Sequence, residues 1–85
     1  MSIEQLRKEI EQIDMSIIEK LAQREKLSKQ IGQIKLQEGV TIIDVSREKK
    51  LFELYEHWCE QYQLSKEFVY NVFKLIITHS REIQR

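Results

Sequence analysis

The stretch from residue 3 to residue 35, IEQLRKEIEQIDMSIIEKLAQREKLSKQIGQIK, decides the fold of this chain. It contains no proline, and apolar residues recur through it on a seven-residue pattern, which is typical of one face of a helix. The positions of this apolar stripe are Ile3, Leu6, Ile10, Ile13, Ile17, Leu27, Ile31 and Ile34. The pattern predicts one long helix with a buried stripe, from about Ser2 to Leu36 or Gln37, that ends near Gly39.

The length of this helix predicts a dimer. At 1.5 Å per residue, a helix of about 35 residues spans roughly 52 Å. A compact domain of this size is only about 30 Å across, so the helix extends beyond any core that one chain can form. Because the stripe is apolar at both ends, we expect a second copy of the chain to cover it, with the two long helices packed together.

The remainder of the chain predicts two shorter helices and no sheet. The β-branched segment 39–43 is typical of an extended linker. Asp44 is a suitable N-cap for a second helix over Val45 to Tyr62, and Ser65 is a suitable N-cap for a third. We therefore expect an all-α fold of three helices that forms a single domain over residues 1–85.

Composition narrows the function classes. The 85 residues carry 14 basic and 14 acidic side chains, and this balance argues against a nucleic-acid-binding protein. No apolar run approaches the ~20 residues of a membrane span, and no signal-peptide pattern opens the chain. The single cysteine, Cys59, cannot form an intrachain disulfide and fits a reducing compartment, so we expect a cytoplasmic protein.

Polar side chains interrupt the apolar faces of all three expected helices. Arg24 falls in phase with the stripe of the first helix, seven residues after Ile17 and seven before Ile31. A guanidinium cannot lose its charge, so its burial is costly unless an anion or a dense hydrogen-bond network meets it. The other interrupting residues are Ser28 and Lys35 on the same helix, Glu48 on the second, and Ser80 and Gln84 on the third.

Each of these residues has an ordinary structural explanation when taken alone. A lone arginine on a core face commonly sets register or forms a salt bridge, and a helix serine commonly bonds its own backbone. Gln84 is typical of a solvated residue, and Glu48 of a charge pair near a helix start. However, salt bridges for Arg24 and Lys35 need two acids, whereas only Glu48 is similarly misplaced. The combination therefore favours a site for a small anion.

Arg7 adds a geometric argument for a site shared between two chains. It precedes Arg24 by 17 residues, which places it about 25 Å away along the helix and about 100° around it. No small ligand contacts both residues within one chain. In a dimer whose long helices run antiparallel, Arg7 of one chain could reach Arg24 of the other, and the site would hold a small dianion.

A set of short motifs follows in order along the chain: Leu6-Arg7, Ile13-Asp14, Arg24-Glu25, Gly32, Lys35, Asp44-x-x-Arg47-Glu48, Phe73, Ile76-Ile77, Ser80 and Gln84. This ordered set resembles the all-helical chorismate mutases, including the mutase domain fused to prephenate dehydratase in many bacteria. The resemblance covers essentially all 85 residues. It implies an intertwined helical homodimer with a long first helix.

The resemblance also implies how the two carboxylates of chorismate are bound. Arg24 would bind the ring carboxylate with help from Ser80. Lys35 and Arg7 of the other subunit would bind the enolpyruvyl carboxylate.

By the same resemblance, Lys35 and Gln84 would donate hydrogen bonds to the ether oxygen, and Arg47 would support the site. Glu48 and the backbone around Asp44 would hold the ring hydroxyl. The implied reaction is a concerted [3,3] rearrangement of chorismate to prephenate in aromatic amino-acid biosynthesis. Such a rearrangement requires no nucleophile, proton shuttle, metal or cofactor.

Other functions are compatible with these motifs. An isochorismate-pyruvate lyase resembles the mutases in fold and in its cationic site, and a mutase acting on 4-amino-4-deoxychorismate is barely separable by sequence. A non-enzymatic alternative is a regulatory module that binds a dicarboxylate. The complete Asp44-x-x-Arg47-Glu48 motif and the presence of both Lys35 and Gln84 favour the chorismate mutase. A partner enzyme that docks and activates so small a mutase is also compatible with the sequence.

Overall fold

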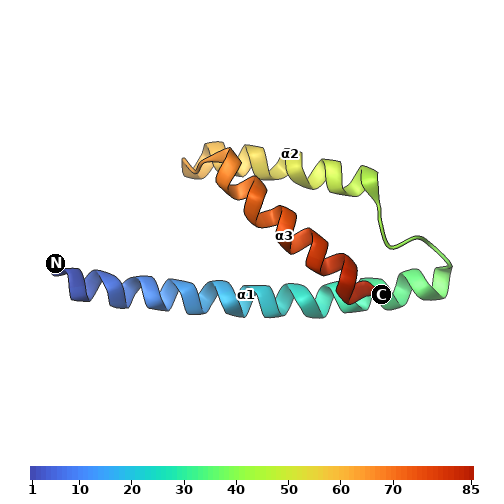
Figure 1. The fold of residues 1–85 in the computed structure, drawn as a ribbon, viewed down its shortest axis with the longest axis horizontal. Helices are drawn as coiled ribbons and strands as arrows, with labels where there is room; N and C mark the ends of the chain where they lie inside the picture. The colour runs from blue at the N-terminus through green and yellow to red at the C-terminus, as the bar shows by residue number, and fades with distance from the viewer.

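Three helices and no strand make up the computed structural model, which describes residues 1–85. They are α1 (Ile3–Glu38), α2 (Val45–Tyr62) and α3 (Lys66–Gln84), as Figure 1 shows. The predicted all-α fold is therefore confirmed, and α1 extends one residue beyond the expected end. None of the three helices combines enough length with enough apolar character to cross a bilayer.

The helix ends are set by capping residues, of which Gly39, Asp44 and Ser65 were predicted from the sequence. Ser2 and Gln5 form a capping box at the start of α1, and Gly39 ends α1 in the left-handed region at φ 69°. A glycine adopts this conformation without the steric penalty of a Cβ. Asp44 and Ser65 each accept a hydrogen bond from the backbone N–H three residues further on, at 3.0 Å and 3.2 Å. These caps place the starts of α2 and α3.

The helix α3 lies between the other two helices. It packs against both α1 and α2, whereas no Cα atom of α1 lies within 8 Å of one in α2. Figure 1 shows α3 running diagonally from the turn after α2 down to α1, so that α2 and α3 diverge from that turn. Aromatic side chains join α2 to α3, with Tyr55 stacked on Phe73 at a centroid distance of 4.2 Å. The divergence separates the backbone at the start of α2 from the backbone at the end of α3 (Figure 1).

The apolar stripe of α1 is not buried within one chain. Its eight residues are each between 44% and 68% exposed, and the only buried residues of α1 are Ser28 and Gly32. One chain therefore leaves exposed the stripe that we expect a second copy to cover, and α3 contacts only the C-terminal part of α1 (Figure 1). The molecule is correspondingly elongated, with extents of 55 × 24 × 16 Å. Its radius of gyration is 16.0 Å, whereas a compact chain of this length has about 12 Å.

Candidate active site

A cavity of about 640 Å³ lies where the three helices and the linker before α2 converge. It brings together six of the seven predicted site residues: Arg24 and Lys35 from α1, Asp44 and Glu48 from the start of α2, and Ser80 and Gln84 from α3. Apolar side chains, among them Ile31 and Ile77, line the rest of its wall. A largely apolar cavity with a few convergent polar groups is the usual form of a small-molecule site.

Arg24 is fixed by a hydroxyl and not by an acid. Its Nη1 donates to Ser80 Oγ, and that hydroxyl donates in turn to the carbonyl of Ile76 at 3.0 Å. Ser80 is buried, so the bond holds the arginine at the junction of α1 and α3. A guanidinium has five N–H donors, so most of them remain available to an anion. The salt-bridge explanation of Arg24 is therefore wrong within this chain.

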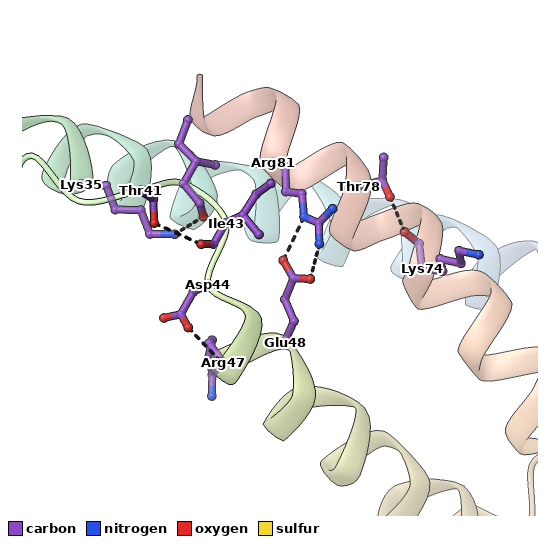
Figure 2. Close-up of polar contacts among 10 residues, drawn as sticks. Lys35, Thr41, Ile43, Asp44, Arg47, Glu48, Lys74, Thr78 and Arg81 are labelled. Carbon is purple, nitrogen blue, oxygen red and sulfur yellow. Dashed lines mark hydrogen bonds and ion pairs between the residues drawn. The ribbon is translucent and has the colours of Figure 1, made fainter.

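Lys35 is held at the other end of the cavity by neutral oxygens. Its Nζ donates to the carbonyl of Ile42 in the linker at 2.6 Å and to Gln84 Oε1 at 3.2 Å. Figure 2 shows the ammonium group pointing toward that linker. The amide oxygen of Gln84 accepts the bond from Lys35, which orients the amide. Its Nε2 has no hydrogen-bond partner in the chain and can donate to a ligand.

Gly32 allows the end of α3 to approach α1. A Cβ at this position would lie 2.7 Å from both the Cα and the carbonyl oxygen of Gln84. No side chain fits at that distance, so the glycine sets how closely the last turn of α3 crosses α1. This crossing places Gln84 beside Lys35, one turn of α1 beyond Gly32.

Glu48 has a partner that the sequence analysis missed. Arg81 Nε donates to Glu48 Oε2 at 2.9 Å, and Arg81 Nη2 donates to Glu48 Oε1, so the pair is bidentate (Figure 2). The hydrogen bond that Arg81 donates to Glu48 raises the pKa of the Arg81 guanidinium above its ordinary value. A usable signal was present, because Arg81 lies four residues after Ile77 and three before Gln84, on the same helical face.

The side chain of Asp44 is used to cap α2. Its Oδ1 accepts from the backbone N–H of Arg47, and Figure 2 shows the carboxylate turned toward the first turn of the helix. Asp44 therefore offers a ligand its backbone more readily than its carboxylate. The side chain of Arg47 lines the cavity without a polar partner.

Arg7 is the one predicted site residue that this chain does not bring to the cavity. It lies on the exposed N-terminal half of α1, about 25 Å along the helix from Arg24. His79 also lies outside the cavity, and its Nε2 is 2.5 Å from Glu25 Oε1.

The charges around the cavity favour a dianion. Four basic residues line it, Arg24, Lys35, Arg47 and Arg81, against two acidic ones, Asp44 and Glu48. The excess of two positive charges belongs to a chain whose overall charge is zero. A concave surface with one excess sign concentrates ligands of the opposite sign.

Comparison with known proteins identifies the family. The family profile for chorismate mutase type II matches residues 6–85. A chorismate mutase of Methanocaldococcus jannaschii is 30% identical over 81 residues, which are 95% of this chain and 82% of that protein. A bifunctional chorismate mutase/prephenate dehydratase of Buchnera aphidicola is 35% identical over 79 residues, 93% of this chain but only 20% of that protein. The matched residues therefore cover most of the Methanocaldococcus jannaschii mutase but only a fifth of the bifunctional protein. This chain belongs to the type II chorismate mutase family.

Proposed function

We propose that this cavity binds chorismate and catalyses its [3,3] rearrangement to prephenate. The observation that carries the proposal is that Arg24 and Lys35 are both fixed by neutral groups. Neither cation is neutralised by a carboxylate of its own chain, and both retain free donors toward the same cavity. Chorismate supplies the two carboxylates that such a pair of cations can bind.

The geometry supports a division of roles among these residues. Arg24, oriented by Ser80, binds the ring carboxylate, because a guanidinium matches a carboxylate with two parallel hydrogen bonds. Lys35 and Gln84 are hydrogen-bonded to each other in the wall of the cavity, and we assign their remaining donors to the ether oxygen. Glu48 accepts from the ring hydroxyl, and the backbone N–H of Asp44 donates to the oxygen of that hydroxyl.

The chemistry demands orientation and charge stabilisation. Binding holds the substrate in the folded conformer, in which its two ends meet. The conformational entropy is then lost on binding and not in the chemical step, which supplies part of the rate enhancement. Negative charge builds on the ether oxygen as the C–O bond breaks, and fixed donors there stabilise the transition state. Loss of one such donor costs roughly 3 to 4 kcal/mol in comparable sites. Lys35 and Gln84 are the donors that we assign to this step.

We infer further that the site is completed in a homodimer. The exposed stripe of α1 and the elongated shape of the chain support a second copy packed along α1. An antiparallel arrangement of the two α1 helices brings Arg7 of one subunit to the cavity of the other, where it binds the enolpyruvyl carboxylate.

Mixing two inactive variants tests the shared site. Arg7→Ala and Lys35→Ala dimers should each be inactive, but a mixed dimer contains one site with both residues intact. Refolding the two together should restore about a quarter of wild-type activity, the statistical share of intact sites in a symmetric dimer. If the mixture stays inactive although mixed dimers form, Arg7 does not act from the neighbouring subunit.

The loss of chorismate absorbance with purified protein tests the reaction itself. Fast decay to prephenate, abolished in Lys35→Ala and retained in the exposed control Lys29→Ala, would support the proposal. Release of pyruvate would instead identify a lyase. Binding of chorismate without decay would identify a binding module or a mutase that needs an activating partner.

A further inference from the structure

Arg81 lines the cavity, but none of the roles described above uses it. It projects from the last turns of α3 and meets Glu48, which projects from the first turn of α2 (Figure 2). The two side chains are 34% and 21% exposed, so solvent screens the pair less than it screens an exposed ion pair. The pair joins the last turns of α3 to the first turn of α2.

The bidentate geometry fixes the direction of the Glu48 carboxylate. A carboxylate has about four lone-pair positions, and the Arg81 fork occupies one on each oxygen. The remaining positions can still accept from a ligand. A glutamate has three rotatable bonds before its carboxylate, and the fork removes that freedom before the ligand arrives.

The charge of Arg81 also affects what Glu48 can accept. A lone carboxylate attracts a protonated amine more strongly than a neutral hydroxyl. With Arg81 on the same carboxylate, an ammonium group bound there faces a second cation a few ångströms away, and like charges at that distance repel strongly in a partly buried site. A hydroxyl carries no such penalty.

We propose that Arg81 is a positioning residue that holds Glu48 as an acceptor for a neutral hydroxyl and selects against an amine at the same ring position. This inference rests on the proposed function. It concerns the choice between chorismate and 4-amino-4-deoxychorismate, an analogue with an amine in place of the ring hydroxyl.

The test compares Arg81→Met with wild type on both substrates. With chorismate, kcat/KM should fall about 10- to 100-fold, the usual effect of misplacing a site group by about 1 Å. With the amino analogue the fall should be smaller, so that the preference shifts toward the amine by about tenfold. Equal losses on both substrates, or no loss on either, would overturn the proposal.

Two controls separate positioning from a structural role. Lys66→Met breaks the other ion pair between α2 and α3, which joins Lys66 to Glu60. This pair lies beside the turn between the two helices and outside the cavity. The substitution should leave both rates and their ratio unchanged. In a Glu48→Gln background, Arg81→Met should have less than about a twofold further effect, because residues that act through one contact are not additive. A full loss in that background would show that Arg81 acts independently of Glu48.

A spectroscopic readout keeps the test independent of turnover and of the proposed function. The carboxyl 13C resonance of Glu48 should shift in Arg81→Met and return toward its wild-type position in Arg81→Lys, which keeps a cation. If this resonance is unchanged, the pair does not form in solution and the proposal is overturned. If it shifts but wild type converts neither substrate, the positioning role stands and the proposed function and its substrate selection fail.

Discussion

Replacement of Gly32 by alanine should lower the catalytic activity of this chain strongly and its free energy of unfolding only slightly. A methyl group at position 32 would lie 2.7 Å from the Cα and carbonyl oxygen of Gln84 and 3.0 Å from its Cβ. Ordinary van der Waals contact begins at 3.4 Å, so the last turn of α3 must retreat by roughly 0.7 Å. Because Gln84 is the last residue of α3, the retreat moves its side chain directly.

The retreat should affect catalysis more than folding. The bond between Lys35 Nζ and Gln84 Oε1 is already 3.2 Å long, and a further shift of this size breaks it. Misplacement of a site group by 1 Å costs up to about 10² in rate, so we expect kcat/KM to fall by roughly 10- to 100-fold. Overpacking costs about 1–3 kcal/mol, and the better helix propensity of alanine offsets about 0.8–1.0 kcal/mol of that. The free energy of unfolding should fall by no more than about 2 kcal/mol.

The assay pairs the chorismate absorbance measurement with urea unfolding of the same preparations. Gly39→Ala is the matched control, since Gly39 has φ 69° and no atom within 4 Å of the added Cβ. It should lose about 1–2 kcal/mol of stability from the left-handed conformation and keep its activity. If Gly32→Ala retains wild-type kcat/KM, or if Gly39→Ala loses as much activity, the close approach does not position Gln84 for catalysis.

Three further predictions concern charges in and outside the cavity. Arg24→Leu should abolish turnover yet leave the melting temperature unchanged or raised, because leucine continues the apolar stripe of α1; a large loss of stability in calorimetry would contradict this. Wild-type activity should be nearly flat across neutral pH, whereas Gln84→Glu should be active only in acid, since a carboxyl donates only when protonated; coincident pH profiles would refute the assigned donor. Hydrogen bonding within the Glu60–Lys66 pair lowers the pKa of Glu60 and raises the pKa of Lys66. Its small stabilisation should therefore be present at neutral pH and disappear as pH falls through the Glu60 pKa or rises through the Lys66 pKa, as melts of wild type and Lys66→Met against pH will show.

The helix boundaries were predictable because their causes are local. Ser2, Asp44 and Ser65 each satisfy backbone N–H groups within three residues, and Gly39 supplies a conformation that few other residues adopt easily. Such signals need no knowledge of distant contacts. The same is true of the seven-residue apolar pattern, which fixes α1 as a single helix.

The burial of the stripe was not predictable for one chain. Periodicity shows which residues favour burial but not which surface covers them. Ile10 and Ile13 lie in phase with Ile31, yet all three are exposed. The first two lie on the N-terminal part of α1, which α3 does not reach, whereas Ile31 is exposed because it lies in the wall of the cavity beside α3. Because α1 is longer than the core that one chain can form, its length predicts a second chain that covers the rest of the stripe.

The site was predictable where a polar residue interrupts an apolar face, and it was missed where a residue fits its local pattern. Arg24, Lys35 and Glu48 stand out on the apolar faces of their own helices, whereas Arg81 lies in the last turn of α3, where a basic side chain is an ordinary complement to the helix dipole. Its partner Glu48 is 33 residues away, and no local rule joins the two. Face assignment on α3 alone would have placed Arg81 beside Ser80 at the cavity.

The Arg81–Glu48 pair also changes the charge argument that first suggested an anion site. In the sequence, one misplaced acid stands against two misplaced cations, so Glu48 could neutralise either Arg24 or Lys35. With both oxygens of Glu48 bound by Arg81, the acid is withdrawn from Arg24 and Lys35, and both cations remain available to a ligand. The net charge of zero does not reveal these two free cations, because it sums the charges of the whole chain. Ligand binding depends instead on the charged groups that converge at the cavity. In the function that we propose, this fixed internal pair keeps Arg24 and Lys35 free to bind the ligand and orients the Glu48 carboxylate that accepts from its hydroxyl.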